Sequence, residues 1–104
     1  MIRVTVLYAN KPEGKFDHAY YANQHMKMVS EKLATMGLVK TEVDKGIGGA
    51  SAGSPPPYVA MGYMVFNSIE DFQKAWAAHG EQFIRDVPNY TNIEPQIQIS
   101  EILT

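Results

Sequence analysis

A histidine stands where the sequence pattern calls for an apolar residue. His25 falls within an apolar stripe that also holds Tyr21 and Val29, spaced as on one face of a helix. A buried imidazole needs a hydrogen-bonding partner, and Tyr21, one helical turn earlier, is within reach. The pair could work as acid and base, or hold a carbonyl or phenol group. The alternative is a core histidine whose nitrogens are satisfied by Tyr21 and a backbone carbonyl.

A second histidine follows the same logic further along the chain. His79 shares a helical stripe with Trp76 and Phe83, so two histidines from different helices could converge on one cavity. The alternative is a histidine near Gly80 that interacts with the dipole of a helix end. Asp86 could be a general acid, or simply a turn former or ion-pair partner. If it lay within reach of His25, it would raise the pKa of the imidazole, which burial alone would lower.

Aromatic residues are frequent enough to hold a planar ligand, although aromatic stripes usually belong to a core. Those that could stack on a ring are Tyr8, Tyr20, Tyr21, Tyr63, Phe72, Trp76, Phe83 and Tyr90. We expect His25 to be the catalytic residue. The candidate substrate-binding residues around it are Tyr21, Trp76, His79, Phe83 and Tyr63.

Metal and haem sites are not indicated. The chain has no cysteine, which excludes disulfides, thiolate metal sites and a cysteine nucleophile. Its three histidines lack the spacings typical of metal ligands, and no haem attachment motif occurs. We therefore predict a protein with no metal and no cofactor.

The first half of the chain reads as a strand, a helix and a second strand. Residues 2–9 alternate with period two, and a turn follows at residues 10–14. Asp17 is a plausible N-cap of a long helix that extends to Met36, with Gly37 just beyond its end. Residues 38–47 alternate weakly, as in an edge strand. The glycine- and proline-rich residues 46–57 indicate a loop of unknown role.

The second half repeats this order. Residues 58–67 are apolar at odd and at even positions alike, which is typical of a strand covered on two faces. Ser68 should cap a helix that begins at Ile69 and continues through Phe83, with a possible break at Gly80. Residues 86–91 have turn chemistry around Pro88, and a final strand is expected over residues 93–103.

The order β-α-β-β-α-β predicts a ferredoxin-like α+β fold, in which a four-stranded antiparallel sheet carries both helices on one face. The helices should cover Ile2, Val4, Val6 and Tyr8. The outer parity of the third strand, which we assign to Met64 and Phe66, would then face water in a monomer. Because large exposed apolar patches mark interfaces, we predict a homodimer in which two sheets pack face to face as an α+β barrel.

Length and charge restrict the partners further. The chain has 104 residues, enough for one domain, and its nine Lys and Arg against eleven Asp and Glu give a net charge of -2. This charge supplies no basic field for nucleic acid. No apolar run approaches the roughly 18 residues of a membrane span, and no secretion signal is evident. We expect a cytoplasmic protein with a small-molecule ligand, no nucleic acid and no membrane.

Two segments of the chain resemble the EthD family. Residues 16–29 contain a Tyr-Tyr pair followed by a His and then by a Met-Val-like hydrophobic step, FDHAYYANQHMKMV. The closing segment at residues 86–100, DVPNYTNIEPQIQIS, is also similar to the family. The resemblance covers essentially the whole chain.

This resemblance implies a dimeric α+β barrel and an association with the catabolism of ethers and other small organic compounds. Proteins on the same barrel include cofactor-free monooxygenases, cyclases, isomerases and haem-degrading enzymes, so the fold does not assign a reaction. The recurrent histidine of the family corresponds to His25, and its paired tyrosines to Tyr20 and Tyr21. This correspondence favours a functional His25 over a core residue.

Three hypotheses of function remain from the sequence. The first is a cofactor-free enzyme that oxidises, cyclises or isomerises a small apolar or aromatic metabolite with His25. The second is a non-catalytic carrier or accessory protein of a degradation pathway, which would show saturable binding without turnover. The third is a structural interaction module, which would have no pocket open to a ligand.

Overall fold

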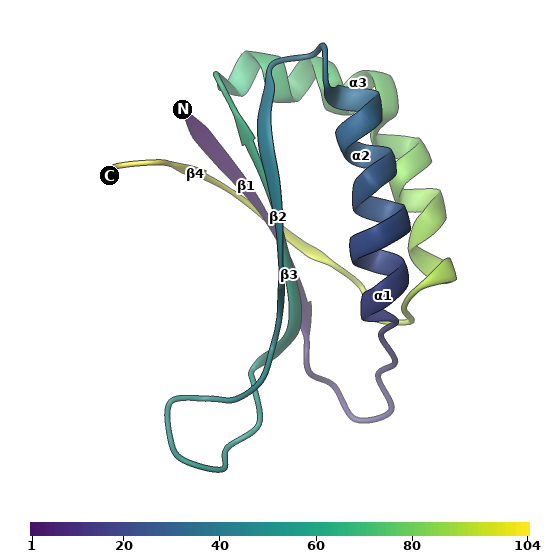
Figure 1. Ribbon diagram of the computed structural model, residues 1–104, viewed down its shortest axis with the longest axis vertical. Coiled ribbons are helices and arrows are strands. Elements are labelled where there is room, and N and C mark those ends of the chain that lie inside the picture. The colour runs from purple at the N-terminus through teal and green to yellow at the C-terminus, as the bar shows by residue number, and fades with distance from the viewer.

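Four strands form one antiparallel sheet in the computed structural model, which describes residues 1–104 (Figure 1). Their bounds are β1 Ile2–Ala9, β2 Leu38–Lys45, β3 Tyr58–Phe66 and β4 Gln96–Glu101. The spatial order β2-β3-β1-β4 places β1 and β3 at the centre, with antiparallel pairing throughout. The predicted ferredoxin-like fold is confirmed.

The first helical region has three consecutive parts: α1 His18–Tyr20, η1 Tyr21–His25 and α2 Met26–Leu33. Asp17 caps it as predicted, because its carboxylate accepts the backbone N–H of Tyr20. The helix ends at Leu33 rather than Met36, and a turn follows. That turn closes at Gly37, whose positive φ of 86° favours glycine.

The second helix, α3, extends from Ile69 to Asp86 and is capped by the hydroxyl of Ser68. The predicted break at Gly80 does not occur. Instead Gly80 makes room for an aromatic ring, because a Cβ there would lie 2.7 Å from the indole of Trp76. The short 3-10 helix η2 Val87–Asn89 follows and contains Pro88.

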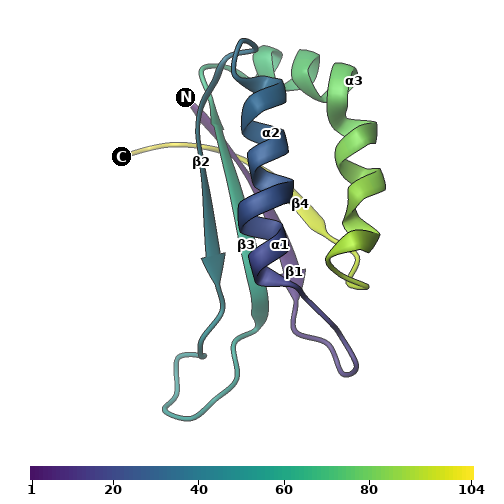
Figure 2. The same ribbon diagram turned by 45° about the vertical axis from the view of Figure 1, so that its right-hand side comes forward.

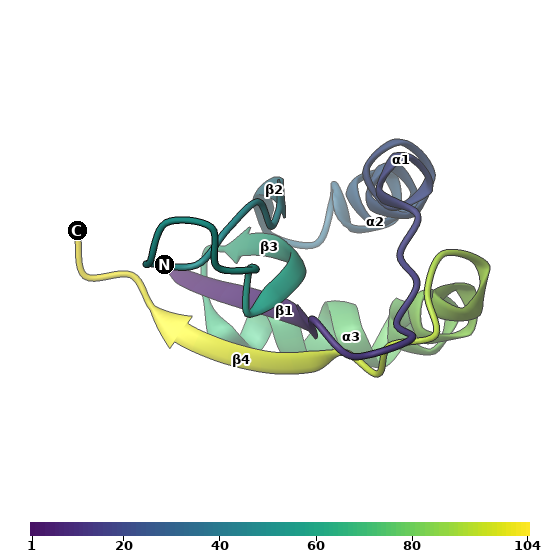
Figure 3. The ribbon, with the colours of Figure 1, turned by 90° about the horizontal axis from the view of Figure 1, so that it is seen from below.

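Both helical regions lie on the same face of the sheet, side by side (Figure 2). Seen from below, α1 and α2 lie toward β2 and β3, with α3 on the other side of the same layer (Figure 3). The core lies between this layer and the sheet. Its largest fully buried side chains are Tyr8, Tyr21, Phe66, Leu33 and Val4.

The structure corrects which side chains of β3 face the helices. Met64 and Phe66, predicted to face outward, are 4% and 0% exposed in the core. The cause is the register, which pairs Met64 with the helix-facing Val4. The residues of β3 on the sheet face without helices are Met61, Tyr63 and Val65.

The connections differ from the sequence expectation mainly at their bounds. β4 begins at Gln96 rather than residue 93, and Ile93 instead packs in the core.

The loop at residues 46–57 projects beyond the end of the sheet between β2 and β3 (Figure 1). Ile47 at its start is 93% exposed. None of the helices combines the length and the apolar character that crossing a membrane would require.

The two methionines of β3 should differ in their effect on stability, because they lie on opposite faces. Met64→Ala leaves a cavity in the core and should lower the free energy of unfolding by about 2–5 kcal/mol. Met61→Ala, the matched control on the face without helices, should cost about 1 kcal/mol or less in a single chain. Urea denaturation of both variants measures this difference. Equal losses at a concentration at which the chain is monomeric would contradict the parity described here.

Candidate functional site

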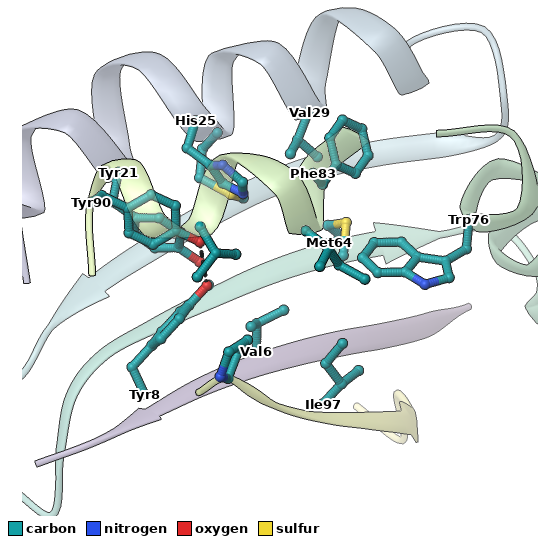
Figure 4. Close-up of a pocket in the computed structure, with 15 residues that line it drawn as sticks. Val6, Tyr8, Tyr21, His25, Val29, Met64, Trp76, Phe83, Tyr90 and Ile97 are labelled. Atoms are coloured by element: carbon teal, nitrogen blue, oxygen red, sulfur yellow. Dashed lines mark hydrogen bonds between the residues drawn. The ribbon is translucent and has the colours of Figure 1, made fainter. Parts of the chain in front are cut away.

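A cavity lies between the helices and the sheet (Figure 4). It encloses about 40 Å³, enough for two or three water molecules. Two exposed residues, Ile84 and Ile97, belong to its lining and mark its opening to solvent. The other lining residues are Val6, Tyr8, Tyr21, His25, Met26, Val29, Gly62, Met64, Trp76, Phe83, Val87, Tyr90 and Pro95.

A wide helical turn sets the position of the histidine. Residues 21–25 form a π-helix in which the backbone N–H of Met26 donates to the carbonyl of Tyr21, five residues earlier. The extra residue in this turn directs both His25 and Met26 inward, and Val29 and Leu33 continue the buried stripe. Such turns are frequent at functional sites. The sequence pattern did not indicate this turn, because Tyr21 and His25 also share a face on an α-helix.

His25 is bonded to a carboxylate at the far end of α3. Its Nδ1 lies 2.8 Å from Oδ2 of Asp86. The other carboxylate oxygen, Oδ1, accepts the Tyr20 hydroxyl at 2.8 Å and the Asn89 amide at 2.9 Å. Burial alone would raise the pKa of Asp86, but the hydrogen bonds from Asn89, His25 and Tyr20 outweigh it and hold the pKa below its ordinary value. Asp86 is therefore ionised at neutral pH.

The ionised carboxylate determines where His25 carries its proton. The imidazole is 6% exposed, and burial lowers its pKa below 6.5, although Asp86 partly opposes this shift. The ring is thus neutral at pH 7. Because a carboxylate only accepts, Nδ1 must hold the single proton and donate it to Asp86. Nε2 is left as a proton acceptor and makes no hydrogen bond in the structure, yet it is not sealed from solvent.

Three tyrosines form the wall beside this histidine. The hydroxyls of Tyr8 and Tyr90 are 2.6 Å apart, and the Tyr90 ring centre lies 4.8 Å from that of His25. Tyr21 stacks on His25 at 5.5 Å, and its hydroxyl fills the space beside Gly62, where a Cβ would lie 1.9 Å away. Burial raises the pKa of all three hydroxyls well above the ordinary value, so they remain protonated.

The structure brings together four of the residues singled out from the sequence. Tyr21, His25, Trp76 and Phe83 all line the cavity. The other two lie elsewhere. His79 is half-buried on α3 outside the lining, with its ring 6.3 Å from that of Phe83. Tyr63 lies on the opposite sheet face, where its hydroxyl donates to Asp44.

The sequence reasoning did not assign Asp86, Tyr8 or Tyr90 to the site. Asp86 had been considered as a carboxylate that could reach His25, but nothing in the local pattern places residues 61 positions apart in contact. Tyr8 and Tyr90 were visible only as members of an aromatic set. The remaining histidine, His18, hydrogen-bonds the backbone carbonyl of Val59. Nowhere do three or more His, Asp or Glu side chains gather as they would around a metal ion.

Comparisons with known proteins agree with this fold. The sequence matches the EthD domain over residues 14–94. The structure is similar to that of an EthD-like protein from Ralstonia eutropha, with a TM-score of 0.93 and 40% identity, covering 99% of this chain and 92% of that one. No curated protein matches the sequence.

Two more distant structures share the fold. An ethyl tert-butyl ether D family protein from Bacillus halodurans is 22% identical, with a TM-score of 0.67 and 99% coverage of both chains. A dimeric ferredoxin-like protein from an uncultured marine organism is 9% identical, with a TM-score of 0.56, covering 100% of this chain and 96% of that one.

The lowered pKa of His25 predicts how the free energy of unfolding depends on pH. The unfolded chain binds a proton on this residue near pH 6.5, whereas the folded chain does so only at lower pH. The unfolded state therefore holds more protons in this window, and the free energy of unfolding should fall as pH decreases from about 7.5 to about 5.5. Urea denaturation across this range measures the slope. His25→Gln should flatten it; an unchanged slope would show that His25 is not its source.

Proposed function

Because this chain belongs to the EthD family, we propose that it binds a small, largely apolar organic molecule in the cavity beside His25 and accepts a proton from it. The observation that carries this proposal is the free Nε2 of a neutral imidazole at an apolar cavity. A base of this kind is ready at neutral pH, and its Nδ1 proton is already committed to Asp86.

Asp86 acts in this proposal as a positioning residue. It holds the imidazole in the tautomer that leaves Nε2 free, and it would stabilise the imidazolium formed when Nε2 takes a proton. The carboxylate is itself fixed by Tyr20 and Asn89. Moving a proton in this way needs no redox group, which is in keeping with the cofactor-free enzyme expected from the sequence.

The size of the cavity restricts the ligand. The enclosed 40 Å³ is far below the roughly 300–1,000 Å³ of a pocket for a drug-sized molecule. A ligand larger than a few atoms must therefore move side chains at the opening. Ile84 and Ile97 are the two exposed residues of the lining, so their side chains can move with the smallest loss of packing.

The binding of small ketones and phenols tests this function. The single tryptophan, Trp76, lines the cavity, so its fluorescence should report a ligand there. We expect saturable binding to the wild type and a dissociation constant at least about tenfold higher in His25→Ala. His79→Ala, the same change outside the cavity, should bind as the wild type does. Absence of any saturable response would refute the proposal.

The same two variants address the carrier hypothesis, which the mainly apolar lining also suits. A carrier would recognise its ligand through apolar contacts. His25→Ala would then keep its affinity within about twofold, because an alanine there removes little apolar surface. A tenfold loss confined to His25→Ala favours the enzyme.

We further propose that the protein is a homodimer in which the sheet faces without helices, one from each copy of the chain, pack against each other. This face carries an apolar strip formed by the half-buried Met61 and Tyr63 on β3, with the half-buried Leu7 beside them on β1. Charged residues of β2 flank the strip on one side. On the other side lie Arg3 and Thr5 of β1 and, beyond them, polar residues of β4. An apolar centre with a polar rim is the usual composition of an interface. A similar fold occurs in the dimeric ferredoxin-like protein described above.

A charge placed in this strip should weaken the dimer. Met61→Lys puts an ammonium group against the apolar partner surface and should raise the dimer dissociation constant at least about tenfold. Gln73→Lys on the exposed side of α3 adds the same charge elsewhere and serves as the control. Sedimentation measures both. A wild-type chain that sediments at 11.6 kDa at micromolar concentration would be evidence against the dimer.

A further inference from the structure

The three tyrosine hydroxyls beside His25 have more O–H donors than the hydrogen bonds between them use. Tyr8 and Tyr90 share one hydrogen bond, which consumes one of their two hydroxyl protons. The Tyr21 ring lies 5.4 Å from that of Tyr8, but its hydroxyl shares no hydrogen bond with either of the other two. In the Tyr8–Tyr90 pair, one O–H donor is therefore left without a protein acceptor.

Tyr90 is the residue best placed to hold this unused proton. Either hydroxyl of the pair can donate to the other, and when Tyr8 donates, the proton of Tyr90 is free. Tyr90 also lies nearer the histidine, with ring centres 4.8 Å apart. Its hydroxyl makes no other hydrogen bond.

An unused acceptor faces the same cavity. Nε2 of His25 has no hydrogen-bonding partner, and both His25 and Tyr90 belong to the lining. A donor and an acceptor that face the same cavity and do not bond each other are together complementary to a ligand that has both functions. The 12 hydrophobic residues among the 15 that line the cavity would surround the rest of that ligand.

We propose that Tyr90 and His25 together recognise a weak acid whose conjugate base is an O–C=C oxyanion: an enolisable carbonyl compound or a phenol. This inference rests on the function proposed above and names its substrate class. The Tyr90 hydroxyl donates to the ligand oxygen, and His25 Nε2 takes the ligand proton. Tyr8 positions the Tyr90 hydroxyl by donating to it.

The proton transfer balances within the site. The C–H or O–H bond of the ligand breaks, its proton forms a bond to Nε2, and the electron pair moves to the ligand oxygen. The negative charge that appears there is offset by the positive charge that appears on the imidazole. The hydrogen bond from Tyr90 strengthens as the oxygen becomes negative, which is the way oxyanion donors favour a reaction. Return of the proton to another atom would give an isomer.

The charge of the cavity excludes the obvious competitor, a ligand that is already anionic. No lysine or arginine lines the cavity, and the ionised Asp86 lies behind His25. A carboxylate ligand would enter this apolar space without a positive partner and close to a negative one, which is costly. A neutral weak acid meets no such penalty.

Two probes distinguish the carbon acid from the oxygen acid. The first is 4-nitrophenol, whose own absorption distinguishes phenol from phenolate, with 4-nitroanisole as the matched ligand that has no proton to give. The second is acetylacetone in D₂O, where NMR follows deuterium entry at the central carbon. We expect bound 4-nitrophenol to show a phenolate-like band and 4-nitroanisole to bind at least about tenfold more weakly. We expect the wild type to accelerate exchange of acetylacetone.

Tyr90→Phe should remove the hydrogen bond while keeping the ring. We expect it to weaken 4-nitrophenol binding at least about tenfold, to diminish the phenolate-like band and to slow the exchange by a similar factor. Tyr63→Phe, the same change on the other face of the sheet, should leave all three unchanged. If Tyr90→Phe does not fold, Tyr8→Phe replaces it: this change removes the hydroxyl that positions Tyr90, so the phenolate-like band should diminish, and an unchanged band would overturn the proposal.

The outcomes separate the two proposals. Phenol binding with the band but without exchange assigns the phenols, whereas exchange that needs Tyr90 and His25 assigns the carbonyl compounds. Saturable binding of 4-nitrophenol with no phenolate-like band, no exchange and no effect of Tyr90→Phe overturns this inference while the proposed binding function stands. Absence of any binding by either probe or by the ketones and phenols overturns both.

Discussion

The hydrogen bond between His25 and Asp86 joins the two helical regions at one end of the cavity. It links the π-turn η1 to the last residue of α3, and the second oxygen of the carboxylate holds Tyr20 and Asn89 as well. Breaking it would leave Oδ2 of Asp86 and Nδ1 of His25 without partners in a largely buried place. The spacing of the helices over the sheet, the tautomer of His25 and the free Nε2 all depend on this contact.

The polar groups of the cavity are kept neutral by their surroundings. Burial lowers the pKa of His25 and raises those of Tyr8, Tyr21 and Tyr90, so each of these groups keeps its uncharged form at neutral pH. Asp86, which is less deeply buried, carries the one charge and distributes it over three donors. Because Asp86 does not line the cavity, the cavity wall combines donors and an acceptor without a charged group, which suits neutral ligands.

The sheet serves two purposes through the two faces of β3. One face packs Met64 and Phe66 under the helices and provides the floor of the cavity. The other carries Met61 and Tyr63, which belong to the strip proposed to meet a second copy of the chain. Because adjacent residues of a strand point in opposite directions, a ligand site and an association surface can lie back to back on a single strand without sharing a side chain.

Periodicity and capping in the sequence were enough to predict the order of elements, the topology and the unusual position of His25, because these depend on neighbours within one or two turns. The EthD resemblance was also visible in the sequence and is confirmed. Tertiary structure decided the rest. Both parities of β3 are apolar, so only the register with β1 shows that Met64 faces inward. The contacts of His25 with Asp86 and of Tyr8 with Tyr90 join residues 61 and 82 positions apart, and no local pattern encodes such pairs.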